Sequence, residues 1–173
     1  MDMESAIIGA ILLAIFIVPL LIMNYNRVRK ENIKLQSLNE FALLHNCKIS
    51  QHEFCGDFVI GLDENRKYVF FFKQKKEDII SQFVDLSGIH SCQVYKKTRT
   101  IECKNEDVVI MERVELRFLP TNKSKVETRF ELYDDETNMQ LSGELQLTDK
   151  WSKQINILLK NKKQVRLRPV VQS

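Results

Sequence analysis

The sequence predicts an α+β protein in which an N-terminal transmembrane helix precedes an antiparallel β-domain that ends in an amphipathic helix. Three observations lead to this prediction: an uncharged apolar stretch at residues 6–23, alternation of apolar and polar residues over most of 58–132, and helical apolar spacing from Thr148 onward. The 173 residues are 44% apolar and 28% charged, which excludes general disorder and suits one domain with an appendage.

The stretch 6–23 reads AIIGAILLAIFIVPLLIM and contains no charge. As a helix it would be about 27 Å long, close to the roughly 30 Å hydrocarbon core of a bilayer. A buried helix of a soluble protein would show a polar stripe, which is missing here, and Pro19 is tolerated in a membrane helix. A signal peptide would begin with basic residues, whereas Asp2 and Glu4 precede this stretch. We therefore expect residues 1–24 to form a permanent anchor.

Basic residues follow the anchor at once and predict its orientation. They are Arg27, Arg29, Lys30 and Lys34. Because basic flanks remain on the cytoplasmic side of a membrane, we expect the rest of the chain to lie in the cytoplasm.

Small residues recur every four positions in the anchor, at Ala6, Ala10 and Ala14. This spacing lets two membrane helices approach closely, so it permits a homodimer. The same residues are also simply common in membrane helices.

Residues 25–45 are rich in helix-forming residues and contain neither Gly nor Pro, so they predict a juxtamembrane helix. Apolar residues fall on only part of a heptad pattern, which is weak evidence for a coiled coil. We expect the first half to be a solvated stalk and Leu38, Phe41, Ala42 and Leu44 to cap the following domain.

Beyond Cys47 the apolar spacing changes to alternation, which predicts six or seven strands in a curved sheet or open barrel. Short polar connections between them imply antiparallel hairpins. Segment 68–72 (YVFFF) is apolar on both faces and predicts a buried central strand. The expected strands are 58–62, 68–72, 91–97, 100–104, 108–118, 126–132 and 139–147, while 79–89 is ambiguous.

The last element is expected to be a helix over 148–160. Thr148 is a candidate N-cap, and Trp151, Ile155 and Leu159 lie on one face. We expect this helix to cover one end of the sheet, completing a domain at 46–160 that is followed by a basic tail at 161–173.

This order of strands, closed by a helix with an early tryptophan, resembles the pleckstrin-homology-like (PH-like) family over residues 54–160. The resemblance implies that Trp151 is structural and packs against the barrel. Lipid-binding members carry a basic cluster in the first hairpin loop, whereas the matching segment 63–67 has only Arg66 and Lys67 beside two acids. The resemblance is closest to bacterial membrane proteins with such domains, which implies an inner-membrane location.

No catalytic or cofactor motif is present: the five glycines form no phosphate-binding loop, and no serine or histidine lies in a known catalytic pattern. The soft ligands Cys47, His52, Cys55, His90 and Cys92 have spacings that match no common zinc site. We therefore predict no enzymatic activity, no cofactor and no metal, and we interpret the cysteines as small buried thiols.

Positive charge is concentrated in two segments. Residues 24–34 carry four basic side chains and one acid, and 160–168 carry five and none, so the net charge of +3 leaves −5 elsewhere. The second group, a candidate contact for anionic lipid or a partner, comprises Lys160, Lys162, Lys163, Arg166 and Arg168. Exposed stacking aromatics are not evident, so nucleic acid is not an expected partner.

These features predict a membrane-anchored cytoplasmic interaction or scaffold module without catalytic activity, with the bilayer and an unidentified protein as partners. Two alternatives remain open. One is an enzyme whose site is assembled only in three dimensions, with His52, His90 and Cys92 as candidates. The other is an envelope-assembly protein with the domain in the periplasm.

Overall fold

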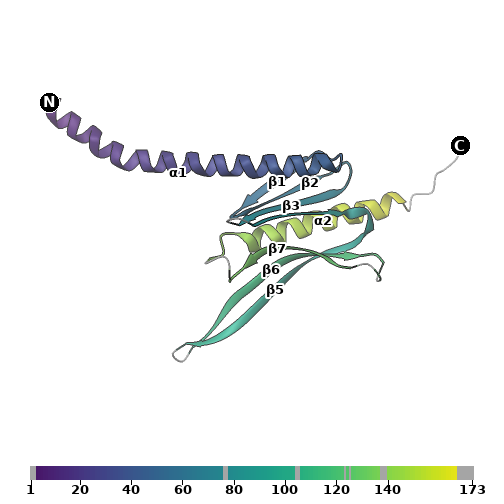
Figure 1. The fold of residues 1–173 in the computed structure, drawn as a ribbon. Coiled ribbons are helices and arrows are strands. Elements are labelled where there is room, and N and C mark those ends of the chain that lie inside the picture. Colours follow the sequence, from purple (N-terminus) through teal and green to yellow (C-terminus); the bar gives the residue numbers. More distant parts are fainter. Residues whose placement is uncertain are drawn as a thin grey trace.

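The computed structural model describes residues 3–75, 78–103, 106–122, 124, 126–136 and 140–166, without the side chains of 3–12, 14, 75, 103, 106 and 162–166. It is an α+β protein with seven strands between two long helices (Figure 1). The elements are α1 (Met3–Leu44), β1 (Gln51–Cys55), β2 (Phe58–Asp63), β3 (Tyr68–Lys75), β4 (Asp78–Asp85), a short 3-10 turn (Leu86–Gly88), β5 (Ile89–Cys103), β6 (Glu106–Pro120), β7 (Thr128–Asp134) and α2 (Glu144–Arg166).

The strands form two antiparallel sheets instead of one continuous sheet. Sheet A has the order β1-β2-β3-β4 and sheet B the order β5-β6-β7. Within each sheet, every strand pairs antiparallel with the next strand in the sequence, so the predicted antiparallel hairpins are confirmed.

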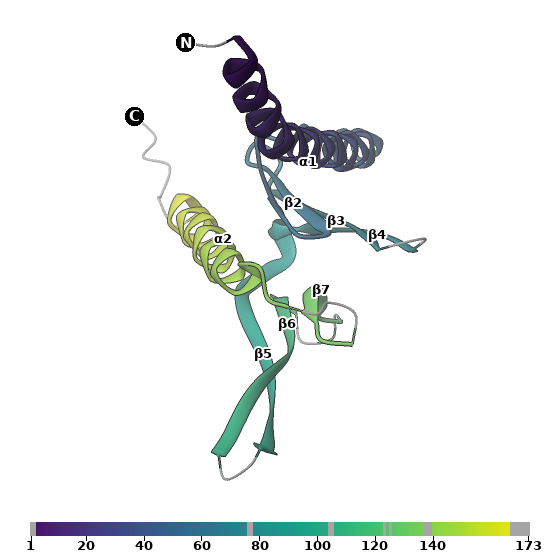
Figure 2. The same ribbon diagram turned by 90° about the vertical axis from the view of Figure 1, so that its left-hand side faces the viewer.

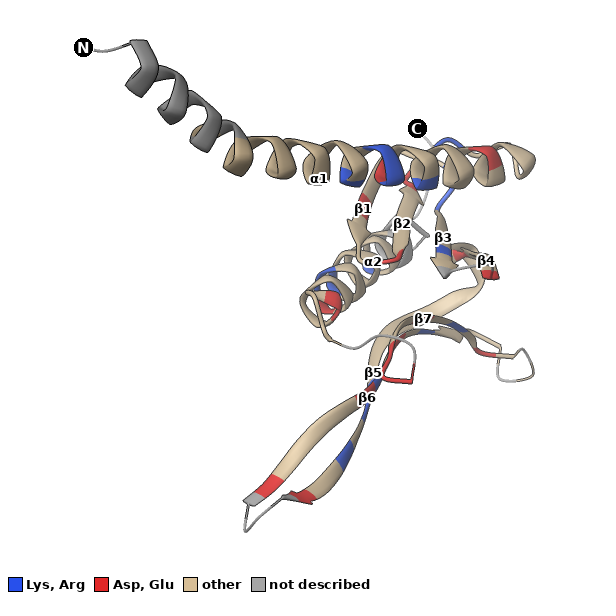
Figure 3. Cartoon of the chain, turned by 60° about the vertical axis from the view of Figure 1, so that its left-hand side comes forward, with Lys and Arg blue, Asp and Glu red and all other residues tan. Residues whose placement is uncertain are grey.

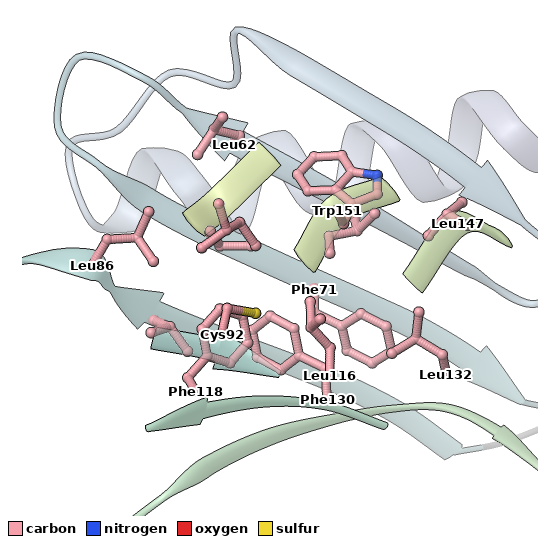
Figure 4. Close-up of a cluster of buried hydrophobic side chains, with 14 of the residues drawn as sticks. Leu62, Phe71, Leu86, Cys92, Leu116, Phe118, Phe130, Leu132, Leu147 and Trp151 are labelled. Carbon is pink, nitrogen blue, oxygen red and sulfur yellow. The ribbon is translucent and has the colours of Figure 1, made fainter. Parts of the chain in front are cut away.

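The two central strands of sheet A are buried on both faces. Phe71 and its alternating neighbours in β2 and β3 point into an inner core shared with sheet B and α2 (Figure 4). Val59, Phe70 and Phe72 point the opposite way, into an outer core beneath α1. The continuous apolar runs FVIGL and YVFFF exist because two layers cover this sheet, and the buried central strand predicted at 68–72 is confirmed.

The predicted anchor and juxtamembrane helix are one uninterrupted helix of 42 residues, with Pro19 inside it. Its C-terminal part lies on sheet A, where Leu38 and Ala42 are fully buried, and its N-terminal half extends beyond the domain (Figure 1). Asn46, with φ of 55°, takes the left-handed conformation that ends many helices.

Within the residues that the structure describes, none of the helices offers an apolar span sufficient to traverse a bilayer. The side chains of Ala6, Ala10 and Ala14, predicted as a dimer face, lie outside the described part.

Two strand predictions were wrong in sheet B. The strands expected at 91–97 and 100–104 are one strand, β5, whose distal half forms with β6 a two-stranded ribbon that projects beyond β7 (Figures 1 and 2). The pairing register shifts between Lys97 and Thr98, which pair with Arg113 and Met111, so Glu112 is the extra residue of a β-bulge in β6. The strand expected at 126–132 begins at Thr128 as β7. Val126, which was expected inside that strand, precedes it and is 89% exposed.

The strand expected at 139–147 was also wrong, because α2 begins at Glu144. Leu147 lies four residues before Trp151, so it extends the buried stripe of the helix. Thr148 is therefore inside the helix and is not its N-cap, and its hydroxyl donates to the carbonyl of Glu144. Helix α2 is described as far as Arg166, so residues 161–166, expected in a tail, are helical.

Helix α2 closes the open side of the domain, between the edges of the two sheets (Figure 2). The Asn156 side chain pairs with both backbone groups of Cys92 on β5, accepting from its N–H at 3.0 Å and donating to its carbonyl at 2.6 Å. On the other side, Trp151 Nε1 donates to Glu53 of β1 at 3.1 Å, and Lys150 Nζ lies 2.9 Å from the same carboxylate. Side-chain groups on α2 thus satisfy polar groups on both edges.

Candidate functional site

The part of α1 that leaves the domain is apolar on all sides and exposed. Its described large side chains range from 49% exposed at Val18 to 73% at Phe16. Nine of the eleven residues from 13 to 23 belong to this set, and 15–18 and 20–23 are unbroken runs, so no face of the helix is polar. The set comprises Leu13, Ile15, Phe16, Ile17, Val18, Leu20, Leu21, Ile22 and Met23.

The basic residues predicted beside the membrane follow on the next turns of the same helix (Figure 3). Arg27 pairs with Glu31, with Nε and Oε1 2.9 Å apart. Lys34 Nζ donates to the backbone carbonyl of Gly56 at 2.8 Å. Lys30 is exposed between them. Arg29, also exposed, does not line the cleft that these three residues share.

That cleft, of about 650 Å³, lies between α1 and the β1–β2 turn. Arg27, Lys30 and Lys34 line it from the helix, with Met23 at its outer end, and Phe54 and Gly56 line it from the sheet. Gly56 has φ of +52°, which a side chain would strain, so the tight turn brings its carbonyl up to Lys34. Burial lowers the pKa of Lys34, and the nearby Asp57 and Glu31 only partly oppose that effect.

Trp151 is 2% exposed and points into the inner core among residues of both sheets (Figure 4). Its indole nitrogen donates a part-buried hydrogen bond to the Glu53 carboxylate. Of the basic residues beyond it, Lys160 is an exposed residue of α2. The side chains of Lys162, Lys163 and Arg166 and the whole of Arg168 lie outside the described part.

The candidate catalytic groups are not brought together at any of five clefts on the described part of the chain. His52 lines one of these clefts, and none of the five is lined by two of His52, His90 and Cys92. Cys92 is buried against α2, and burial raises the pKa of its thiol to about 12.

Cys47 and Cys55, considered with His52 as metal ligands, lie in different layers, Cys47 in the outer core and Cys55 against the inner core. Among the described residues, no three His, Cys, Asp or Glu side chains are grouped closely enough to hold a metal ion.

The polar face of sheet B carries a network of ion pairs that sequence reasoning did not identify. Arg113 Nη2 lies 2.6 Å from Asp134, and Arg117 Nε lies 2.8 Å from the buried Glu115. The Arg117 guanidinium also lies 3.3 Å above the ring of Tyr95. The alternation of Arg and Glu at 113–117 indicated this polar face, but the cross-strand partners on β5 and β7 depend on register. These charges neutralise one another within the sheet.

Comparison with protein family models, with curated proteins and with solved structures found no match.

Proposed function

We propose that the chain is a single-pass membrane protein whose apolar helix anchors a cytoplasmic, non-catalytic interaction or scaffold domain of PH-like architecture. One observation carries the proposal: the exposed apolar stretch of α1. Fully burying a large apolar side chain is worth about 1.5–3 kcal/mol, so nine side chains that are 49–73% exposed cost on the order of 10 kcal/mol in water. In the sequence, residues 6–12 continue the stretch without a charge.

A bilayer accounts for this stretch better than a protein groove. A groove contacts one stripe of a helix and leaves the opposite side polar, whereas lipid surrounds a helix on every side. In the described part of the stretch, no charged side chain occurs before the basic group at residues 27–34 (Figure 3). That order supports a cytoplasmic domain, because basic flanks resist translocation.

The PH-like assignment is supported by a four-stranded sheet, a three-stranded sheet and a closing helix with a buried tryptophan, in that order. The first hairpin turn is formed by Gly56 and Asp57 and joins β1 to β2. The segment 63–67, which the sequence suggested as the first hairpin loop, joins β2 to β3. Neither turn has a dense basic cluster, so the proposal does not include phosphoinositide binding at these turns.

An interaction role is supported by the outer strand of sheet A. β4 is an edge strand, and Ile79, Ile80 and Phe83 on it are 62%, 39% and 40% exposed. Edge strands with exposed apolar side chains are favourable sites for protein association.

The proposal is tested by expressing the full chain in a bacterium and fractionating the cells. We expect the protein in the membrane pellet after alkaline extraction, and a double variant Phe16→Glu/Leu20→Glu in the soluble fraction or degraded. The matched control is Leu44→Glu, which changes a 79% exposed residue of the same helix outside the apolar stretch and leaves the protein in the pellet.

A compartment-specific reporter fused after Ser173 tests the orientation. We expect a reporter that works in the cytoplasm to be active and one that works in the periplasm to be inactive. Wild-type protein in the soluble fraction, or protein trimmed just beyond residue 24, would contradict the anchor. Activity of the periplasmic reporter at this position, without activity of the cytoplasmic one, would contradict the orientation.

A further inference from the structure

We propose that the cleft between α1 and the β1–β2 turn holds the phosphate group of an anionic phospholipid of the cytoplasmic leaflet, with Lys30 and Lys34 as its cationic contacts. The inference rests on the proposed function, because it requires the apolar stretch of α1 to lie in the bilayer.

The cleft lies at the depth of the headgroups. Met23, the last residue of the apolar stretch, lines its outer end. Lys30 follows seven residues later and Lys34 eleven residues later, which is about 10 Å and 17 Å along a helix. The headgroup layer on each side of a bilayer is roughly 5–8 Å thick, so the side chain of Lys30 reaches that layer, and the cleft continues from there inward to Lys34. A lipid beside α1 would thus have its phosphate level with the cleft while its acyl chains remain beside the apolar stretch.

Lys30 and Lys34 give the cleft a positive charge that the surrounding acids do not cancel. Glu31, which also lines it, is paired with Arg27 at 2.9 Å. Asp57 lies 3.9 Å from the buried Lys73. Lys30 has no ion pair within the described part of the chain. Lys34 donates one hydrogen bond to a neutral carbonyl and keeps two further N–H groups.

Lys34 is also held in a position where an anion would stabilise it. It is half-buried, and burial lowers its pKa because the charged form loses water. A second positive charge at Lys30 acts in the same direction. A phosphate in the cleft would relieve both effects, since an ammonium group beside a phosphate is favoured more strongly away from bulk water.

The geometry provides a matched control on the same helix. Positions 23, 27, 30 and 34 face the β1–β2 turn, whereas Arg29 does not line the cleft. General attraction of a basic segment to an anionic surface would count Arg29 equally with Lys30. Binding in the cleft would instead depend on Lys30, which lines it, and not on Arg29.

The test titrates the full-length protein in detergent with phosphatidylglycerol, and separately with phosphatidylcholine of the same acyl chains, and follows bound lipid by native mass spectrometry. We expect Lys30→Gln/Lys34→Gln to weaken phosphatidylglycerol binding about 10- to 30-fold, at roughly one basic contact each. Arg29→Gln and Arg66→Gln should each change phosphatidylglycerol binding by less than about twofold. Neither side chain lines the cleft, so each would interact with the bound lipid only at long range. Inorganic phosphate at millimolar concentration should not displace the lipid.

The proposal is overturned if Arg29→Gln weakens binding as much as the double variant, if the double variant binds normally, or if phosphatidylcholine binds as tightly. Displacement by inorganic phosphate would show a site for soluble anions instead of lipid. Trp151 fluorescence checks folding, and Lys30→Gln alone, at an exposed position, replaces the double variant if that one unfolds. Wild-type protein that is membrane-bound without lipid preference refutes only the cleft, whereas soluble wild-type protein refutes the anchor.

Discussion

Asp63, at the end of β2, shows how one buried polar side chain fixes a turn. It is 3% exposed, and its carboxylate accepts from the backbone N–H groups of Lys48 at 2.8 Å and Arg66 at 3.0 Å. Its own carbonyl accepts from Lys67, which adopts a φ of 61°. The carboxylate thus joins the β2–β3 turn to the segment that follows α1.

We expect Asp63→Ala to lower the free energy of unfolding by about 2–3 kcal/mol, because the backbone N–H groups of Lys48 and Arg66 lose a charged acceptor. Chemical denaturation measures the loss. Glu64→Ala, which removes the neighbouring exposed acid, should cost less than about 0.5 kcal/mol. Equal losses for the two variants would mean that the two hydrogen bonds of Asp63 contribute nothing specific.

The same residue gives the direction of the acid dependence. Burial alone raises the pKa of Asp63, but the backbone N–H groups of Arg66 and Lys48 outweigh it and hold the pKa below its ordinary value of 3.8. The stabilisation is therefore complete above the unfolded pKa and is lost as the pH falls through the lower folded pKa. The difference in stability between wild type and Asp63→Ala should shrink at acidic pH and stay constant at neutral pH.

At the scale of elements, Gly61 sets how closely α1 approaches sheet A. A Cβ at this position would lie 2.8 Å from Leu38 Cδ2 and 3.1 Å from Ile49 Cγ2. Gly61→Val should therefore push the helix outward and lower the free energy of unfolding by about 1–3 kcal/mol.

Gly88 is the control for this substitution, since a Cβ there has nothing within 4 Å. Gly88→Ala should change the free energy of unfolding by less than about 0.5 kcal/mol. If Gly61→Val were as mild, the contact between α1 and sheet A would not be close-packed in solution.

The elements that the sequence predicted well are those whose pattern is local. Residues 68–72 and 128–132 carry their spacing within a few positions, and both are strands. The start of α2 was missed because the spacing of Leu145 and Leu147 also fits a strand, and only packing against both sheets decides for a helix. The division into two sheets depends on contacts between distant residues, which no local pattern specifies.

The candidate site was predictable only in part. Arg27, Lys30 and Lys34 were identified as basic residues beside the apolar stretch, but their common cleft depends on the β1–β2 turn lying against α1. Strand β1 itself was not predicted, so Phe54 and Gly56 had no assigned place. Seven-residue spacing from Arg27 to Lys34 was the available signal that both lie on one helix face.

At the scale of the whole molecule, sheet A joins two cores that share the same strands. Val59, Phe70 and Phe72 face α1, while the alternate residues of β2 and β3 face sheet B and α2. Detaching α1 would expose these three side chains, at a cost of about 5–9 kcal/mol. Since domains are stable by only about 5–15 kcal/mol, loss of the outer layer would remove most of the stability of the inner one.

We therefore expect the two cores to unfold together, and two buried thiols can report on it. Cys47 lies in the outer core and Cys92 in the inner core, each 2% exposed, and burial raises the pKa of both thiols. Variants in which Cys47 or Cys92 is the single remaining cysteine, with Cys55 and Cys103 also replaced, are treated in detergent with a thiol reagent across a denaturant series. The two labelling midpoints should coincide. Labelling of Cys47 at clearly lower denaturant would show that α1 detaches from a domain that remains folded, and the anchor would then be a separable element.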